Sequence, residues 1–313
     1  MRSSAHVRQE NMPQVSAVIP NYNGRMLLAK HLMSVLRCLR DQDQLVIVDD
    51  ASTDSSVNWL INFYRLHKVK RVPEKVIPHD KQAYEVWEGD YHFSPSKQIS
   101  LMLIVNLENL RFGAAANRGV ELASGELILL LNSDVSPHED ILSYLLPRLK
   151  SDVFAVACLE VERHKGSIIF GGKNTLSFQR GMFIHARAVK FNAGKTAWVT
   201  GGSGLYDRAK WLEIGGFDSR YYPAYWEDVD LSWQARKLGW QVLFEPKAIV
   251  DHNHESTNKD AFGIQQMQAM SWHNANKFVQ KNANWKQKIL HFLWQPYWIW
   301  KTAKGFSTEA VNV

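Results

Sequence analysis

The first half of the chain contains four short, mostly apolar segments, and each of them runs into a polar turn. They span residues 15–20, 45–48, 99–105 and 126–131. Apolar runs of this length between turn residues are typical of strands buried on both faces of a sheet. Patterns with helical spacing lie between them, at 27–39, 55–64 and 113–123. Strands that alternate with helices predict an α/β fold with a mostly parallel, Rossmann-like central sheet and helices on both faces.

The rest of the chain is less regular, and composition suggests its boundaries. Residues 1–14 are polar, and we expect them to be disordered. Residues 68–98 are charged and show no clear period, so we interpret them as a loop insertion. Strand-like segments recur in the second half with no linker between them. We therefore expect one continuous domain over 15–283, followed by an aromatic and basic tail over 284–313.

Composition excludes several classes of protein. The net charge of +6 is too small to indicate nucleic-acid binding, and no nucleic-acid-binding signature is present, so we expect no nucleic-acid partner. No run of about 18 apolar residues occurs, as a membrane-spanning helix would need. The two cysteines, Cys38 and Cys158, lie in apolar segments, and no apolar leader precedes them. Buried thiols without a signal peptide favour a cytoplasmic protein.

Polar side chains follow the predicted strands at the edge where parallel α/β sheets bind ligands. Asp49 and Asp50 follow the second strand, and Asn132-Ser133-Asp134 follows the fourth. The side-chain oxygens of Asn132 and Asp134 suit Mg²⁺ or Mn²⁺, with coordination sites left open for phosphate oxygens. The alternative is a turn that caps the next helix. The first interpretation predicts a complex of a divalent metal and a nucleotide at this edge.

Three carboxylates lie within four positions at Glu227, Asp228 and Asp230, after an aromatic pair that ends at Trp226. Like charges this close raise one another's pKa, and such clusters are often functional sites. The alternative is the first turn of a helix, where acidic side chains complement the helix dipole. Together with Asp134, this cluster favours a site in which one carboxylate is a general base and an aromatic ring stacks on a sugar.

Two further features are weaker on their own. His252 follows a buried run, where it is either a site residue or an ordinary surface or core histidine. Gly201 and Gly202 form a turn that either exposes backbone N–H groups to a ligand or only reverses the chain. With the carboxylates they fit a reaction that releases a diphosphate, whose developing charge a metal would neutralise.

Six motifs occur in order along residues 15–255. They lie at 15–24, 46–55, 109–119, 132–134, 215–218 and 225–239. With them the chain resembles the family 2 glycosyltransferases, inverting enzymes of the GT-A fold that use nucleotide-sugar donors. The chain lacks the Gln-x-x-Arg-Trp motif of the processive polysaccharide synthases in this family. The resemblance therefore favours a non-processive, rhamnosyltransferase-like type.

The resemblance implies roles at the nucleotide and the metal. The nucleoside pocket would include Pro20, Tyr22 and Asp49, with Asp49 as the partner of the base. The rest of the implied nucleotide site is Gly113, Asn117 and Asn132. Asp134 is implied as the principal metal ligand, and His252 would reach the metal or the diphosphate.

The resemblance also implies roles in the transfer itself. Asp228 would be the catalytic base, and Glu227 would position the acceptor. Gly202 and Trp226 would contact the donor sugar or the acceptor. A hydroxyl of a glycan or lipid-linked acceptor would attack the donor sugar and invert its anomeric configuration, in the synthesis of a cell-envelope polysaccharide. The implied cofactor is Mg²⁺ or Mn²⁺.

The sequence departs from the family pattern at three positions. Asn132 stands first in the Asp-x-Asp motif, Arg111 stands where glycine is usual, and Gln234 stands where arginine is usual. The first change weakens the metal site. One alternative is therefore a non-catalytic protein that binds sugar nucleotides. A less favoured alternative is a sugar nucleotidyltransferase, whose glycine- and arginine-rich phosphate loop this chain lacks.

The segment 284–306 is rich in tryptophan and edged by lysine. This composition suits peripheral contact with a membrane, with rings at headgroup depth and ammonium groups toward anionic lipid. The alternative is a tail packed on the domain or on a second subunit, since aromatic residues also dominate protein interfaces. Pro296 is expected to break or kink a helix there.

Overall fold

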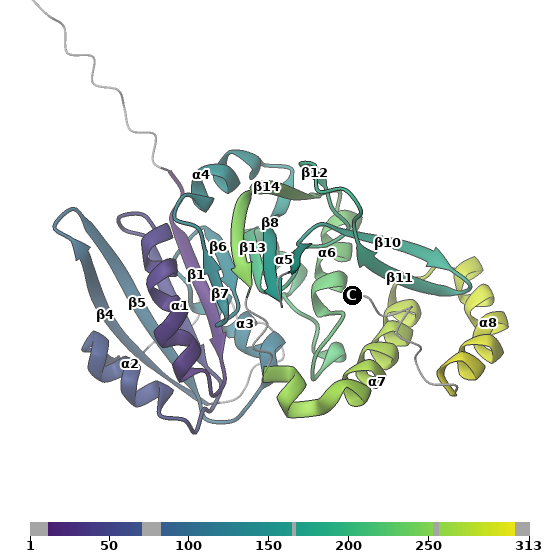
Figure 1. Ribbon diagram of the computed structural model, residues 1–313, viewed down its shortest axis with the longest axis horizontal. Helices are drawn as coiled ribbons and strands as arrows, with labels where there is room; N and C mark the ends of the chain where they lie inside the picture. The colour runs from purple at the N-terminus through teal and green to yellow at the C-terminus, as the bar shows by residue number, and fades with distance from the viewer. Residues whose placement is uncertain (1–11, 71–82, 165–166, 253–256, 304–313) are drawn as a thin grey trace, which may run out of the picture.

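The computed structural model describes residues 12–70, 83–164, 167–252 and 257–303 (Figure 1). The expected parallel centre is confirmed, and its strands run in the order β6-β1-β2-β5. Its elements are β1 (Val15–Asn21), α1 (Arg25–Cys38), β2 (Gln44–Asp49), α2 (Ser56–Tyr64), β5 (Lys97–Asn106), α3 (Arg111–Leu122) and β6 (Leu127–Leu131). Each apolar segment of the first half is thus a strand whose carboxyl end lies at one edge of the sheet.

The prediction of a loop over 68–98 is wrong for most of its length. A short strand β3 (His67–Val69) pairs with β4 (Tyr84–Ser94), and β4 is antiparallel to β5. Residues 71–82 lie outside the described part. The strand β4 lies near the sheet edge, where Asp90 is exposed while Val86 is buried. Its charges belong to an exposed strand, which a search for apolar runs does not find.

The second half extends the sheet with mixed strand directions. Strand β13 is antiparallel to β6 and β8, whereas β14 is parallel to β8. The strands of this half are β7 (Val135–Pro137), β8 (Val153–His164), β9 (Ser167–Gly171), β10 (Asn174–Gln179), β11 (Met182–Arg187), β12 (Gly194–Lys195), β13 (Ser203–Asp207) and β14 (Gln241–His252). The helical elements are α4 (Ile141–Leu145), η1 (Leu146–Arg148), α5 (Arg208–Ile214), η2 (Ser219–Tyr221), α6 (Glu227–Lys237), α7 (Thr257–Asn282) and α8 (Trp285–Ala303).

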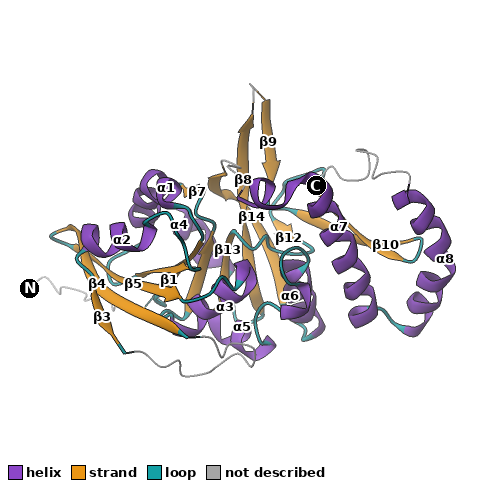
Figure 2. Ribbon diagram, turned by 90° about the horizontal axis from the view of Figure 1, so that it is seen from below, coloured by secondary structure: helices purple, strands orange, loops and turns teal. Residues whose placement is uncertain are grey.

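Helices cover both faces of the sheet, as expected (Figure 2). Alternate side chains of β1 point to opposite faces, so Ala17 and Ile19 join a core with α1, α2 and α4, and Val18 joins a core with α3, α5 and α6. A third cluster lies outside the sheet, where the hairpin β10–β11 packs against α6, α7 and α8. This cluster includes Phe278 and Trp298, so the aromatic tail packs on the domain along one side.

The expected break at Pro296 is wrong, because α8 continues through it. Contacts on both sides of the proline hold the helix against the β10–β11 turn. The Trp298 Nε1 donates to the Arg180 carbonyl at 2.7 Å, and His291 Nδ1 lies 2.9 Å from the Gly181 carbonyl. Among the described residues, no helix is long and apolar enough to cross a membrane.

Candidate functional site

The polar turns after β1, β2, β5 and β6 meet at the carboxyl edge of the parallel strands, as the sequence predicts. Three of these turns contain a residue with left-handed backbone that is not glycine: Asn23 (φ 51°), Ala51 (φ 60°) and Arg111 (φ 71°). Left-handed conformations cost such residues about 1–3 kcal/mol each and concentrate at functional sites. The value at Arg111 also gives the reason why glycine is usual there.

Asp49 and Asp50 join these turns to one another. Both oxygens of Asp49 accept hydrogen bonds, from Asn21 Nδ2 and from the Ser52 N–H, each at 2.9 Å. Asp50 accepts from the backbone N–H groups of Leu110 and Arg111 at 2.9 and 2.7 Å. Burial raises the pKa of both carboxyls, although these hydrogen bonds oppose the rise. Asp49, expected beside a nucleobase, is fully buried and stabilises the wall of the pocket.

The turn after β6 lies against the glycine turn before β13. The Asn132 N–H donates to the Gly202 carbonyl at 3.1 Å. A Cβ at Gly202 would lie 2.2 Å from Asn132 Nδ2, so any larger residue would displace the Asn132 side chain. A Cβ at Gly24 would lie 2.4 Å from Asn21 Oδ1 and 3.5 Å from Ser133 Oγ. The start of α1, the 132–134 turn and the Gly202 turn therefore form one continuous surface.

Asp134 and His252 come together although they are far apart in sequence. His252 Nε2 lies 3.4 Å from Asp134 Oδ1, and both side chains are nearly buried. Burial alone would lower the pKa of His252, but the hydrogen bond to Asp134 and the charge of Glu160 outweigh it and raise the pKa. Glu160, whose carboxylate accepts from Ser203 Oγ, was not predicted because it lies in the middle of β8.

This pair fits a divalent cation only in part. Among the described residues, no group of three or more His, Cys, Asp or Glu side chains could hold a metal. A nearly buried carboxylate beside an imidazole supplies two suitable donors, and the oxygens of a diphosphate would complete the coordination. The donor set therefore suits a cation that arrives with a phosphorylated ligand.

Helix α6 begins with the acidic cluster and is preceded by a strained turn. Tyr225 and Trp226 are both left-handed, with φ of 76° and 78°. Asp228 accepts from the Val229 N–H at 2.7 Å and from the Gly201 N–H at 3.4 Å. Burial raises the pKa of both Glu227 and Asp228, and the charge of Asp228 raises that of Glu227 further. A carboxylate with a raised pKa is a better proton acceptor than an ordinary one.

A cavity of about 280 Å³ lies between the start of α3 and the segment 217–224. Glu227 lines it, and Glu227 Oε2 is buried with no hydrogen-bond partner among the described residues. Gly113 and Asn117 line it too. The amide of Asn117 is bonded to Phe217, donating to its carbonyl at 2.9 Å and accepting from its N–H at 2.8 Å. Asn117 thus holds the Gly-Gly-Phe-Asp turn against α3.

The structure places Trp226 differently from the sequence prediction. Its side chain is 4% exposed and packs against His185 and Phe278, with ring centroids 4.9 and 5.0 Å away. Its ring is therefore not available to stack on a sugar. Near the β1 turn, by contrast, Tyr22 is 36% exposed at the edge of the predicted nucleoside pocket, and Pro20 is half-buried.

Helix α7 supports the turn that carries the acidic residues. Asn274 Nδ2 donates to the carbonyls of Tyr221, Ala224 and Tyr225 at 2.8, 2.9 and 3.0 Å. Lys281 Nζ lies 2.6 Å from Asp230 and 2.7 Å from Asp218. Asp230 is therefore a structural member of the acidic cluster, whereas among the described residues neither Glu227 nor Asp228 has a hydrogen bond to α7. No sequence pattern indicates these supports, which lie about 50 residues away along the chain.

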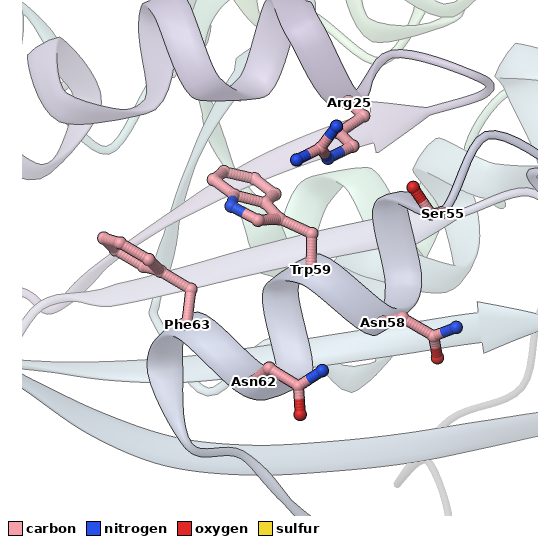
Figure 3. Close-up of a pocket in the computed structure, with 6 residues that line it drawn as sticks. All are labelled: Arg25, Ser55, Asn58, Trp59, Asn62 and Phe63. Atoms are coloured by element: carbon pink, nitrogen blue, oxygen red, sulfur yellow. The ribbon is translucent and has the colours of Figure 1, made fainter.

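A second pocket lies along α2 and holds none of the predicted site residues (Figure 3). It is lined by Arg25, Ser55, Asn58, Trp59, Asn62 and Phe63. Figure 3 shows the Arg25 guanidinium extending beside the Trp59 ring. The lining includes no carboxylate or imidazole, so it offers no acid–base chemistry. The candidate site is therefore the strand-end surface with the Glu227 cavity.

Two family models match the chain. The model described as "Glycosyltransferase like family 2" matches residues 93–272, and "Glycosyl transferase family 2" matches residues 16–79. The first match covers more than half of the chain and contains the turn after β6 and the start of α6.

Curated relatives match with low identity or over short stretches. The N-acetylglucosaminyl-diphospho-decaprenol L-rhamnosyltransferase of Mycobacterium tuberculosis is 39% identical over 64 residues, 20% of each chain. The amylovoran biosynthesis glycosyltransferase AmsB of Erwinia amylovora is 23% identical over 252 residues, 76% of this chain and 69% of that protein. The poly-beta-1,6-N-acetyl-D-glucosamine synthase of Staphylococcus epidermidis is 22% identical over 238 residues, 75% of this chain and 48% of that protein. The chain thus spans a fifth of the first relative and about half of the last.

Solved structures share the fold. GalNAc-T7, solved with UDP, GalNAc and Mn²⁺, has a TM-score of 0.61 at 14% identity, covering 96% of this chain and 59% of that chain. TarS of S. aureus, solved with UDP, has a TM-score of 0.53 at 15% identity, covering 96% and 76%. These likenesses establish a GT-A-type fold.

Proposed function

The chain belongs to the glycosyltransferase-like family 2, and from this premise we propose an inverting, non-processive transfer from a nucleotide-sugar donor to a hydroxyl of a glycan or lipid-linked acceptor. The observation that carries the proposal is the pair Glu227 and Asp228, which begins α6 beside the glycine turn. In the described part of the chain, neither carboxylate bonds to α7. The names of the bacterial relatives support a place in cell-envelope polysaccharide synthesis.

In the proposed reaction, Asp228 accepts the proton of the acceptor hydroxyl. The hydroxyl oxygen forms a bond to the anomeric carbon from the face opposite the nucleotide, and the bond to the diphosphate oxygen breaks. One displacement inverts the anomeric configuration. Glu227, whose Oε2 is buried at the cavity with no partner in the described part of the chain, accepts a hydrogen bond from a second acceptor hydroxyl and so orients it.

The donor would lie along the strand-end surface. Pro20, Tyr22 and the wall braced by Asp49 would hold the nucleoside, and Asn132 and the Gly202 turn would face the sugar and the diphosphate. Asp134 and His252 would hold a divalent cation, which when bound neutralises charge on the departing diphosphate. Two neighbouring folds were solved with Mn²⁺ and either UDP or GDP-mannose, which supports this arrangement.

The first test is donor binding, measured by thermal unfolding with nucleoside diphosphates and nucleotide sugars, with and without Mn²⁺. A ligand at 100 times its Kd adds about 2.7 kcal/mol to the free energy of unfolding. We expect one nucleotide to stabilise the protein in a Mn²⁺-dependent manner, and Asp134→Asn to remove that dependence. No stabilisation by any donor would contradict the proposal.

The second test is catalysis, measured as release of nucleoside diphosphate from the donor that binds. Asp228→Asn should lower turnover by about 10²–10⁴-fold with donor binding kept. Asp41→Asn, an exposed change at the opposite edge of the sheet, is the control. Full activity of a folded Asp228→Asn protein would refute the assignment of the base. Donor binding without turnover in the unmutated protein would favour a non-catalytic binder of sugar nucleotides.

A further inference from the structure

The outward face of α8 is apolar, which is unusual for a surface helix. Phe292 is 77% exposed, Trp285 69% and Leu293 64%. Ile289, Ile299 and Trp300 are more than half exposed as well. These positions recur at spacings of three, four and seven residues, so they form one stripe along the helix. A solvent-facing stripe of this kind marks an interaction surface.

The orientation of the stripe is fixed by the opposite face of the helix. His291 and Trp298 contact the carbonyls of the β10–β11 turn, and the Tyr297 hydroxyl lies 2.6 Å from Arg180 Nη1. A Cβ at Gly181 would lie 2.7 Å from the His291 Cα, so helix and turn are in close backbone contact. The apolar stripe therefore cannot turn inward without breaking this packing.

The charges around the stripe have one sign. Lys286, Lys288 and Lys301 lie on α8, and the chain contains no Asp or Glu from residue 261 to residue 308. A second copy of the chain on a twofold axis would bring these lysines against their equivalents. An anionic surface complements them. Tryptophan and phenylalanine rings flanked by lysine are typical of helices that lie in the headgroup region of a bilayer.

We propose that α8 docks in the plane of an anionic lipid bilayer through the stripe formed by Trp285, Ile289, Phe292, Leu293, Ile299 and Trp300. The 19-residue helix is about 28 Å long, and only its outer face would be buried in the headgroup region. The docking itself does not depend on the proposed function. Its use, which is to hold the enzyme beside a lipid-linked acceptor, rests on that function.

The experiment is flotation of the full chain with vesicles of phosphatidylcholine alone and of phosphatidylcholine mixed with phosphatidylglycerol. We expect the protein to float with the anionic vesicles. The triple variant Phe292→Ser, Leu293→Ser, Ile299→Ser should partition roughly 10³-fold less, about tenfold for each side chain. A matched control changes exposed apolar residues elsewhere, Phe63→Ser and Val189→Ser, and should float like the unmutated protein.

The lysines supply a second variant with a different signature. Lys286→Gln, Lys288→Gln and Lys301→Gln together should reduce partition onto anionic vesicles by roughly 10²-fold, with little change on neutral ones. Nucleotide-dependent thermal stabilisation reports on the fold and the donor site in every variant, so a failure of the proposed function is seen separately. Equal flotation of the triple serine variant, or flotation of no protein at all, would overturn the docking. If the unmutated protein does not float but self-associates, and the serine variant abolishes that association, the stripe contacts a second copy of the chain instead.

Discussion

The support that α7 gives to the turn before α6 can be tested with the isosteric change Asn274→Asp. The side chain is 1% exposed and its amide nitrogen faces the carbonyls of Tyr221, Ala224 and Tyr225 at 2.8–3.0 Å. The change keeps the size of the side chain and replaces a donor by an acceptor. It therefore places a buried carboxylate against three carbonyl oxygens.

The magnitude follows from these contacts. An amide nitrogen has two hydrogens, so about two full hydrogen bonds are lost, at about 1 kcal/mol each. The repulsion and the burial of an unpaired carboxylate add to this, for a total loss of about 3–5 kcal/mol in the free energy of unfolding. The loss should shrink at acid pH, because a protonated carboxyl can donate again. Turnover should fall more than donor affinity, since the displaced turn carries Glu227 and Asp228 while the nucleotide surface lies on other turns.

The assay combines chemical denaturation at several pH values with turnover and donor-binding measurements. Asn276→Asp is the matched control, because this asparagine lies on the same helix and donates to the Trp272 carbonyl one turn earlier rather than to the turn before α6. If Asn274→Asp and Asn276→Asp unfold alike, the three carbonyl contacts do not support the turn. If stability falls but turnover at saturating donor stays unchanged, the turn does not position the acids.

Further predictions follow from single positions. Gly202→Ala should displace the Asn132 side chain and weaken donor binding at least tenfold in titrations, a loss of about 1.4 kcal/mol. The methyl group of Gly113→Ala meets an ordinary contact of 3.5 Å, so this variant should leave stability unchanged. Arg111→Gly should be more stable than Arg111→Ala by about 1 kcal/mol in denaturant titrations, because only glycine relieves the left-handed strain. The raised pKa of Glu227, about 8, makes the folded state bind more protons than the unfolded state between about pH 4 and pH 8. The free energy of unfolding should therefore fall as pH rises through this window, and Glu227→Gln should flatten that slope in the same titrations. Unchanged donor affinity of Gly202→Ala would contradict the role of the glycine turn, and equal stability of the two Arg111 variants would contradict the strain at that position. An equal pH slope in the unmutated protein and in Glu227→Gln would contradict the raised pKa of Glu227.

The parallel centre of the fold was predictable because its strands are buried on both faces and so read as apolar runs. The 45–48 run and the 126–131 run both correspond to strands, β2 and β6. Only one strand of the β4–β5 hairpin was predicted, because β5 is apolar whereas β4 mixes charged, polar and aromatic side chains near the sheet edge. Burial on one face leaves a weaker pattern, which charged residues obscure.

The candidate site was predictable where chemistry and chain position coincide. Asp134 and Asp228 follow a strand end and begin a helix, so the type of residue and its place both point to a site. Glu160 lies within a strand, and its closeness to His252 depends on the pairing of β8 with β14. The prediction that the Trp226 ring stacks on a sugar was wrong because two left-handed residues turn the ring toward α7. No sequence pattern indicates such a turn in the absence of glycine.

The two interpretations of the tail are compatible because they concern opposite faces of α8. The packed face is established by the contacts of His291 and Trp298, and the apolar stripe lies on the other face. Helix α7 braces the turn before α6 through Asn274 and leads directly into α8, and Trp272 of α7 packs on Trp298 with ring centroids 5.1 Å apart. A surface that holds α8 therefore also sets the orientation of the turn that carries Glu227 and Asp228. In a transferase acting at a bilayer, this coupling would present the site to acceptors in one orientation, which suits a substrate anchored in the lipid.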